Sequence, residues 1–498
     1  MSLPSRFAFS NWPPALSETE LEALTLYATT YALSHGLLYL PPIQPQPTIP
    51  NSAIHAPLSL FPSPFPGRLF LLARRLQSMY NILYARIAMD VQFLDSVMGS
   101  IEGVGKVDEF VGQLWTGWRS LRDEGLVQPL QLGLFRSDYL LHAGLNDEPL
   151  SLKQVEFNTI SSSFGTLSER TAALHRYLFA ATSYFNAYPD MKPDDFPPNN
   201  TTAGLVEGLA TAHAAYNVEN AKILFVVQAG ERNVFDQRLL EYELLEKHSI
   251  HVIRQTFDQL EASASVDSVT RALFISDTEV STVYFRAGYT PADYPSATQY
   301  ATRFLLERSR AIKCPSIALQ LAGGKKVQQV LTQPGVLERF LNDIPAAQVE
   351  ELRSSWMGMW GLDEESGTQK ARDLAERLVL KPQREGGGNN VYKEAIPPFL
   401  DTLPPLERQA WIAMELIAPP EGTGNYLVRA GSEGAQSAVK VDVVSELGIF
   451  GWALFGGQDG GVKEKEVGWL VRTKGKDSNE GGVATGFSVL DSILLVSD

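Results

Sequence analysis

Between Ala221 and about Gly324 the sequence alternates between strand-like and helix-like segments, and this alternation constrains the fold more than any other feature. The strand-like segments are residues 223–227, 250–257, 271–275 and 282–285, and the helix-like segments are 233–247 and 297–310. Such an order at this spacing is typical of a parallel sheet covered by helices. The sequence therefore predicts an α/β domain over residues 221–324, inserted into a larger mixed α/β (α+β) fold.

The flanking regions predict the rest of that fold. A helix is expected over 17–35, and nine prolines between Pro41 and Gly67 predict an extended connector on the surface. Further helices are expected over 68–95, 107–123, 348–356 and 369–377, and further strands over 132–141, 152–160, 378–382, 411–417, 425–429, 438–444, 447–454 and 467–472. The expected domains are 1–220, 221–324 and 325–498.

Composition excludes several classes of protein. The 498 residues carry 42 basic and 57 acidic side chains, a net charge of −15, which argues against nucleic acid or an anionic membrane as the main partner. The single cysteine, Cys314, excludes an intrachain disulfide and a cysteine-rich metal site. No apolar run approaches the ~18 residues of a membrane span. We expect a soluble protein of a reducing compartment, with the cytoplasm as its location.

The strongest chemical signal is the stretch Lys381–Asn390, directly after the strand-like residues 378–380. Three consecutive glycines, 386–388, allow backbone N–H groups to approach an anion. Lys381 supplies a positive charge for a phosphate, and Glu385 supplies an oxygen ligand suited to Mg²⁺. The alternative is a flexible hairpin tip.

A second candidate is the pair Glu156 and Asn158 in a predicted strand. Residues two apart on a strand share a face, so a carboxylate and an amide oxygen could hold a hard cation together. The alternative is an ordinary strand edge that faces solvent. Ser161–Ser163 resemble the capped start of a helix that continues over 167–178.

Basic side chains at strand ends form a third group. Arg136 and Arg286 lie in otherwise apolar strands, where an arginine is uncommon unless it is paired, and its fork fits a carboxylate. Arg472 and Lys474 precede the small-residue loop 480–486, an arrangement that suits an anionic substrate under a mobile cover. Internal salt bridges and a solvated strand end are the alternatives.

Two further residues and several absent motifs complete the chemistry. Lys325 opens a predicted helix, where it could meet a phosphate, and Glu446 ends a predicted strand. The sequence contains no HExxH metal motif, no Gly-x-Ser-x-Gly elbow and no GxGxxG fingerprint. Hydrolase and dinucleotide-dependent readings therefore have no support.

Taken together, these stretches resemble the eukaryotic glutathione synthetase family. The matching segments, in order from about Leu134 to the C-terminus, are GLFRSDY, QVEFNTISSSFG, ERNVFDQR, VYFRAGY, KCPSIALQLAGGKKVQQ, LKPQREGGGNNVY, AMELI, SELGIFG, and RTK with GGVATG. The resemblance implies an ATP-grasp fold with permuted connectivity and a glycine-rich lid at about 360–420. It implies ATP-dependent ligation of γ-glutamylcysteine with glycine, a cytosolic homodimer and two Mg²⁺ per subunit.

The resemblance also implies roles for single residues. Those implied to hold Mg²⁺ are Glu156, Asn158 and Glu385. Those implied to bind ATP and its metal are Glu156, Lys325, Lys381, Pro382, Gln383, Arg384, Glu385, Gly386, Gly387, Gly388, Asn389, Asn390, Tyr392, Met414, Glu415, Leu416, Ile417, Glu446, Lys474 and Glu480. Those implied to line the peptide site are Arg136, Ile160, Ser161, Ser162, Ser163, Glu231, Arg232, Asn233, Gln237, Arg286, Ala287, Gly288, Tyr289, Arg472, Val483 and Ala484. Among them, Arg136, Lys325, Lys381 and Arg472 are the implied catalytic residues.

The chain departs from the family pattern at three positions: Ala287 replaces a common Asp, Leu416 a frequent Lys, and Glu480 a usual Asp. Two alternatives remain open at this point. One is a ligase of the same fold with another acceptor, such as β-alanine or serine. The other is a non-catalytic ATP-grasp scaffold, against which the intact set Glu156, Asn158 and Glu385 argues.

Overall fold

The computed structural model describes residues 12–41, 52–144, 148–183, 191–385, 387–431, 438–458, 460–478, 482–483, 486 and 488–497. Its helices are α1 Glu18–Ser34, α2 Gly67–Met89, α3 Val91–Met98, α4 Glu109–Glu124, α5 Gly165–Ala181, α6 Thr201–Tyr216, α7 Val234–His248, α8 Phe257–Ser263, α9 Ala297–Arg308, α10 Ile317–Ala322, α11 Lys325–Leu331, α12 Val336–Phe340, α13 Ala346–Ser354, α14 Glu365–Asp373 and α15 Ile396–Thr402. Its strands are β1 Leu38–Tyr39, β2 Ile54–His55, β3 Leu58–Ser59, β4 Ser63–Pro66, β5 Gln131–His142, β6 Ser151–Asn158, β7 Lys222–Val226, β8 Val252–Gln255, β9 Ala264–Val266, β10 Leu273–Ile275, β11 Thr278–Phe285, β12 Ile312–Cys314, β13 Met359–Gly361, β14 Leu378–Lys381, β15 Val391–Tyr392, β16 Ile412–Glu415, β17 Gly424–Val428, β18 Ala438–Phe455, β19 Val462–Gly475, β20 Ser488–Asp491 and β21 Ile493–Val496.

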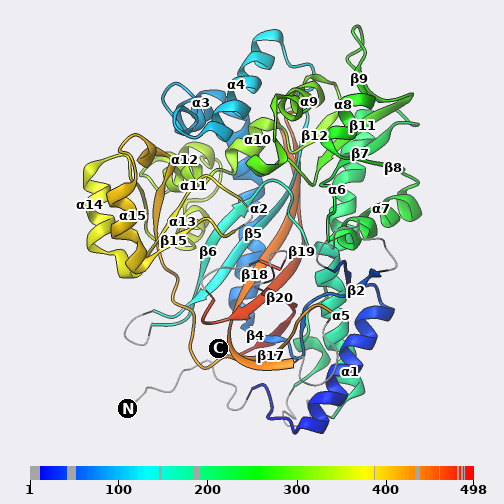
Figure 1. Cartoon of the computed structure of the whole chain (residues 1–498), viewed down its shortest axis with the longest axis vertical. Helices are drawn as coiled ribbons and strands as arrows, with labels where there is room; N and C mark the ends of the chain where they lie inside the picture. The colour runs from blue at the N-terminus through cyan, green and yellow to red at the C-terminus, as the bar shows by residue number, and fades with distance from the viewer. Residues whose placement is uncertain are drawn as a thin grey trace.

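A large mixed sheet forms the centre of the molecule (Figure 1). Strands β5, β18, β19 and β20 are antiparallel neighbours, and among the described residues β6 pairs only with β5. The two strands expected over 438–444 and 447–454 are one continuous strand, β18, because Ser445 and Glu446 keep their pairing with β19.

Helices cover both faces of this sheet. Helix α2 packs on one face of β18, β19 and β5, and α5 and α6 pack on the other. The side chains alternate accordingly: Leu447 and Ile449 belong to the core on the α2 side, and Phe450 and Trp452 to the core on the α5 and α6 side. Even-numbered residues of this part of β18 therefore share a face with the α5 and α6 core.

Three of the four strands predicted in the region 221–324, β7, β8 and β11, are parallel. The prediction is wrong for the strand expected over 271–275, because β10 is antiparallel to both β9 and β11, and it missed β12. β8, β7, β11 and β12 are adjacent and parallel, with helices α7 and α9 between them in sequence, as the alternation indicated. β12 also pairs with β5 in parallel, so these strands continue the large sheet. The strand expected over 250–257 is shorter, because Thr256 caps α8.

A second, four-stranded sheet has the order β13-β16-β14-β15 and is antiparallel. With α14 and α15 it forms the lobe at the left of Figure 1, which has a small apolar core of its own. This lobe carries the glycine-rich stretch after β14.

The prediction of a surface connector over 41–67 is wrong for the described part, residues 52–66. Leu58, Leu60 and Phe61 are fully buried, and β3 pairs with β17 and β20. Within the described part of the chain, β4 pairs with β21 and with no other strand. Such an edge position tolerates Pro64 and Pro66, which lack an N–H. Residues 42–51 lie outside the described residues.

Two helix predictions also need correction. The helix expected over 68–95 ends at Met89, and Asp90 caps a separate helix, α3. The N-terminus of α5 is not capped by Ser161–Ser163: buried Asp236 accepts hydrogen bonds from the backbone N–H groups of Phe164 (2.8 Å) and Thr166 (2.9 Å). The cap comes from a distant segment, which sequence spacing cannot indicate.

Within the described residues, no helix has the length and apolar character that crossing a membrane requires.

Candidate active site

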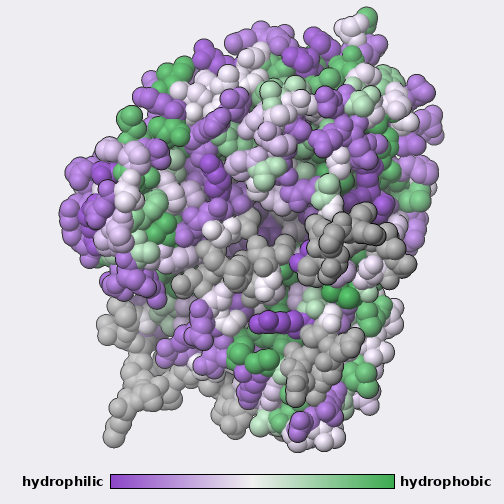
Figure 2. Space-filling model, viewed as in Figure 1, coloured by the Kyte–Doolittle hydropathy of each residue, from purple (hydrophilic) through white to green (hydrophobic). Residues whose placement is uncertain are grey.

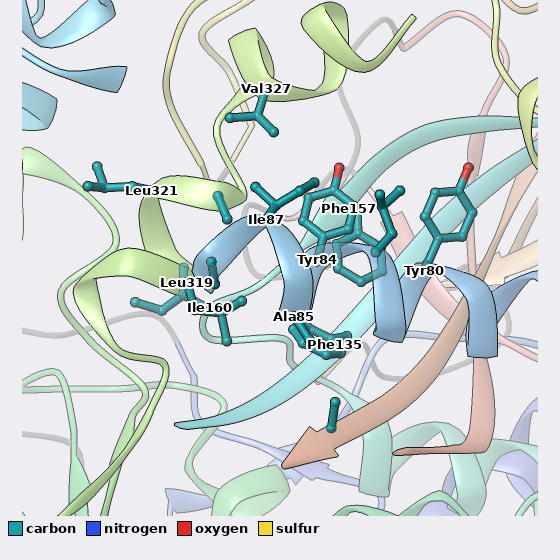
Figure 3. Close-up of a cluster of buried hydrophobic side chains, with 14 of the residues drawn as sticks. Tyr80, Tyr84, Ala85, Ile87, Phe135, Phe157, Ile160, Leu319, Leu321 and Val327 are labelled. Atoms are coloured by element: carbon teal, nitrogen blue, oxygen red, sulfur yellow. The ribbon is translucent and has the colours of Figure 1, made fainter. Parts of the chain in front are cut away.

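The edge strand β6 is held by its apolar side. Phe157 stacks on Tyr84 of α2 with ring centroids 4.0 Å apart, and Tyr80 lies beside them (Figure 3). Because side chains alternate along a strand, Glu156 and Asn158 face the opposite side. The α2 contact therefore fixes which way the predicted metal ligands point, and β6 is not an ordinary solvated edge.

Lys325 joins the two predicted carboxylate ligands. Its Nζ donates to Glu156 Oε2 at 2.8 Å and to Glu385 Oε1 at 3.0 Å. The turn before α11 comes close to the end of β6, and a Cβ on Gly323 in that turn would lie 2.3 Å from Thr159 Oγ1. Glycine therefore allows the close approach that places Lys325 beside Glu156. The site thus brings β6, α11 and the stretch after β14 together.

The charges in this cluster perturb one another. Burial opposes the charge of Lys325, but Glu156 and Glu385 outweigh it and raise the pKa of the lysine. Burial likewise opposes ionisation of Glu156, yet Lys325 and Lys381 hold its pKa below the usual range. Burial raises the pKa of Glu385, although Lys325 acts against that shift.

Lys381 lies beside this cluster at the end of β14. Its Nζ donates to the Val155 carbonyl at 2.9 Å, and burial lowers its pKa to about 8. Lys381 is therefore a cation without a directly bonded carboxylate among the described residues, which suits an incoming phosphate.

The residues after Lys381 are held by hydrogen bonds to neighbouring segments and to one another. The Gln383 side chain accepts from Lys326 N and donates to the Ala410 carbonyl, and Arg384 donates to Asp108 at 2.5 Å. Other bonds within this stretch and with β15 are Asn389 Nδ2 to the Gly387 carbonyl and Asn390 Nδ2 to the Tyr392 hydroxyl. The predicted Gly386 lies outside the described residues.

A carboxylate that the sequence analysis missed, Asp138, organises the neighbouring strands. It is fully buried and accepts from Arg136 Nε (2.6 Å) and Nη2 (2.8 Å), Asn158 Nδ2 (2.9 Å) and Arg472 Nη2 (3.0 Å). Arg472 also pairs with Glu446, its cross-strand neighbour. Burial raises the pKa of Glu446, against the effect of Arg472. For Arg136 and Arg472 the internal salt bridge is thus real.

Arg286 is different, because no carboxylate lies within ion-pair distance of it in the described part of the chain. It is 4% exposed, and its Nη1 donates to the Ser162 carbonyl at 2.8 Å. Its Nε has no hydrogen-bond partner among those residues. Burial opposes its charge, but Tyr284, Asp236 and Glu231 raise its pKa. A buried, charged and incompletely bonded guanidinium suits an anionic ligand.

The segment 231–237 lies near Arg286. Glu231 accepts from Asn233 N (2.8 Å) and Gln237 Nε2 (3.2 Å). The Asn233 side chain is 2% exposed, and neither its oxygen nor its nitrogen has a partner among the described residues. Arg232 instead donates to the Leu40 carbonyl and packs on Tyr39.

Backbone geometry shapes the rest of the peptide-side set. Ser161 has φ 53°, and its hydroxyl donates to the Phe285 carbonyl, which ties the 160–163 turn to β11. The backbone N–H groups of Gly288 and Tyr289 donate to Asp293 (3.0 and 3.1 Å). Buried Ala287 precedes that turn.

The remaining predicted residues fall in three groups. Met414 and Glu415 are in β16, and Leu416 N donates to the Arg377 carbonyl just after it. Lys474 lies two residues from Arg472 on β19, and Val483 is buried in the apolar core. Glu480 and Ala484 lie outside the described residues.

The donor set fits a hard divalent cation. Glu156 and Glu385 supply carboxylate oxygens around one ammonium, and the Asn158 N–H₂ group is bonded to Arg136 O and Asp138, which leaves its oxygen for a cation. Within the described residues, no three His, Cys, Asp or Glu side chains are grouped closely enough to hold an ion alone. Mg²⁺ would therefore share its coordination with phosphate oxygens, as it does in nucleotide sites.

Figure 2, viewed from the same side as Figure 1, shows a recess near the middle of the molecule, with hydrophilic residues around it. The site residues come from two sheets: β6 and β5 belong to the large sheet, and β14 belongs to the small one. The arrangement thus combines Lys325 and Lys381, beside carboxylates suited to a metal, with a buried Arg286 that has no carboxylate partner among the described residues.

Comparison with known proteins shows which family the chain belongs to. The family described as eukaryotic glutathione synthase, ATP binding domain, matches residues 18–495. The glutathione synthetase of Homo sapiens is 41% identical over 490 residues, 97% of this chain and 99% of the human protein. The glutathione synthetase large chain of Schizosaccharomyces pombe is 38% identical over 508 residues, 96% of this chain and 98% of that one.

A solved structure is also similar over almost the full length. A glutathione synthetase-like effector from Globodera pallida, in its apo form, has a TM-score of 0.75 and 25% identity, and the match covers 97% of this chain and 98% of that chain. The predicted family, mixed α/β ATP-grasp fold, use of ATP and ligase class are confirmed. The chain belongs to the eukaryotic glutathione synthase family of ATP-dependent ligases.

Proposed function

We propose that this chain joins γ-glutamylcysteine to glycine, with ATP as the energy source, and so forms glutathione, ADP and phosphate. The observation that carries the proposal is the register of β5 and β6, in which Glu156 lies opposite Asp138. This register puts the Lys325 cluster beside Arg136 and Arg472. Phosphorylation of a carboxylate brings two anions together, the γ-phosphate of ATP and the carboxylate of the peptide. The cations that would bind each of them must therefore lie side by side.

The chemistry needs no nucleophile from the chain. A carboxylate oxygen of γ-glutamylcysteine attacks the γ-phosphorus of ATP, and the bond to the ADP oxygen breaks. The neutral amine of glycine then attacks the acyl carbon, phosphate leaves, and the amine loses a proton. Lys325 and Lys381 neutralise the transferring phosphoryl group in this proposal.

We assign the metal role to Glu156, Asn158 and Glu385, and two Mg²⁺ per subunit remain our proposal. Bound Mg²⁺ would neutralise phosphate charge and align ATP for in-line transfer. Arg136, Arg286 and Arg472 would bind charged groups of the peptide, and Asn233 its polar groups. The segments 387–390, 414–417, Glu446 and Lys474 would contact the nucleotide.

The acyl phosphate would be hydrolysed by water, so the site needs a cover. We propose the four-stranded lobe, about 360–420, as the lid, and the region 221–324 as the substrate-binding domain between the core segments 1–220 and 325–498. A homodimer in the cytoplasm is likewise a proposal that the family suggests.

Phosphate release from ATP tests the function. We expect release only with both γ-glutamylcysteine and an acceptor, and glycine should be the best acceptor. Equal or faster turnover with β-alanine or serine would overturn the acceptor assignment. No turnover with any acceptor would instead favour a non-catalytic scaffold.

A further inference from the structure

We infer that Asp138 is a positioning residue that sets two arginines and the metal-side asparagine in one arrangement. The inference rests on the proposed function, since it concerns how that site is held. Asp138 itself touches none of the expected ligands in this account; it acts through Arg136, Arg472 and Asn158.

The four hydrogen bonds divide unequally between the two carboxylate oxygens. Oδ1 accepts from Arg136 Nε (2.6 Å), and Oδ2 accepts from Arg136 Nη2 (2.8 Å), Asn158 Nδ2 (2.9 Å) and Arg472 Nη2 (3.0 Å). The Arg136 contact is bidentate, so the plane of its guanidinium is fixed. Oδ2 is the atom on which the side chains of both peptide-side arginines and of Asn158 converge.

The shared atom couples the two halves of the site. Asn158 can offer its oxygen to a cation only while its nitrogen is directed to Asp138 and to the Arg136 carbonyl (3.1 Å). A change at Asp138 therefore releases the amide as well as the arginines. A purely structural salt bridge would have no such link to metal dependence.

Gly448 provides the space for this arrangement. It lies opposite Asp138 in the register of β18 and β5, and a Cβ there would be 2.9 Å from both Asp138 Oδ1 and Arg136 Cδ. Its φ is outside the left-handed region, so alanine fits the backbone. Gly448→Ala would thus displace the pair and keep every charge.

Asp491 supplies a matched control. It is also fully buried, and it accepts from the hydroxyls of Ser63 (2.7 Å) and Thr473 (2.6 Å) instead of from arginine. Thr473 and Ser445 lie beside it on the α2 side of the sheet, whereas Asp138 lies on the α5 and α6 side. Asp491→Asn removes a buried charge from the same sheet without touching the arginines.

The experiment compares Asp138→Asn, Gly448→Ala and Asp491→Asn with the wild type in steady-state phosphate release, with ATP, γ-glutamylcysteine, glycine and Mg²⁺ varied in turn. For Asp138→Asn we expect kcat/KM for the peptide to fall about 10- to 100-fold and the Mg²⁺ concentration for half-maximal rate to rise several-fold. The KM for glycine should change less. Gly448→Ala should show the same pattern more weakly, and Asp491→Asn only a lower thermal midpoint.

The possible results distinguish a failure of the proposed function from a failure of the positioning role of Asp138. If the wild type is inactive with these substrates, the proposed function fails, whatever the variants do. If the wild type is active and Asp138→Asn lowers only the thermal midpoint, as Asp491→Asn does, the positioning role is overturned. Should Asp138→Asn not fold, a Gly448→Ala enzyme with wild-type peptide and Mg²⁺ constants would overturn it equally.

Discussion

The two halves of the site differ in how their charges are satisfied. In the nucleotide half, Lys325 is bonded to both Glu156 and Glu385. In the peptide half, buried Arg286 and Asn233 keep polar atoms without a partner among the described residues. The Lys325 cluster is closed by its own ion pairs. In the peptide half Arg136 and Arg472 are paired as well, with Asp138 and Glu446, whereas the side formed by Arg286 and Asn233 is left open.

The difference teaches how each ligand would enter. ATP and its metal must replace the bonds between Lys325 and the two glutamates with new ones. The free energy of binding is therefore smaller than the number of charges in the site suggests. The peptide meets groups already desolvated, and an unmade bond to a buried polar group costs about 1–3 kcal/mol. The peptide would supply the partners that these atoms of Arg286 and Asn233 lack among the described residues.

The largest effect on turnover is expected at Lys325, because the ion pairs of the nucleotide half depend on this one side chain. Lys325→Gln should lower kcat about 10²- to 10³-fold, because the phosphoryl group loses a preplaced charge and the two glutamates lose their common partner. Lys326→Gln is the matched control, since this neighbour pairs with Asp363 instead. The measurement is kcat for phosphate release at saturating substrates. An equal fall in kcat in both variants would contradict the role assigned to Lys325.

Glu385→Gln should act mainly through Mg²⁺. An oxygen remains, but a negative charge toward the metal is lost, so the Mg²⁺ concentration for half-maximal rate should rise about 10- to 100-fold. The thermal midpoint should move little, because Lys325 keeps its bond to Glu156. Wild-type turnover at limiting Mg²⁺ would refute the assignment.

Arg286→Lys tests the open side of the peptide half. It keeps the charge but loses the fork, and one charge-assisted bond of about 1.5–3 kcal/mol corresponds to a roughly ten- to hundredfold fall in kcat/KM for the peptide. The KM for ATP should change much less. Arg310→Lys is the control, because that arginine of the same region is paired with Glu279 at 2.6 Å. Early unfolding of Arg286→Lys with a normal peptide KM would make Arg286 structural.

The smallest effect concerns pH. Burial lowers the pKa of Lys381 to about 8 from its usual 10.5, with Glu156, Lys325, Glu446 and Glu385 around it. The KM for ATP should therefore rise as pH increases through about 8, by at most about tenfold per pH unit, as the ammonium loses its proton.

The free energy of unfolding should instead rise with pH, over the range in which the affinity for ATP falls. The charged lysine costs the folded state free energy below pH 8, and that cost disappears between about 8 and 10.5. Lys381→Arg should move the rise in KM to higher pH, as an arginine stays charged. A pH-independent KM in the wild type up to pH 9.5 would exclude Lys381 as the titrating group.

Local patterns predicted much of this molecule. The parallel strands β7, β8 and β11, the start of α11 at Lys325 and the shared face of Glu156 and Asn158 follow from periodicity and glycine spacing. Asp138 could have been found in the same way, since it lies two residues after Arg136 on one strand. An arginine and a carboxylate at that spacing share a face.

What sequence reasoning missed depends on distant contacts. The prolines before α2 predicted a surface connector, but β3 and β4 are held by β17, β20 and β21 from the far end of the chain. Asp236 caps α5 from a helix some seventy residues on. Neither local propensity nor periodicity carries such information.

Titration calorimetry of γ-glutamylcysteine into the protein without nucleotide or Mg²⁺ tests the contrast between the halves most directly. The account predicts binding at one site per chain, weakened at least about tenfold by Arg286→Lys and little changed by Lys325→Gln. Binding that occurs only after ATP and Mg²⁺ are added would contradict a peptide site that is open at Arg286 and preformed.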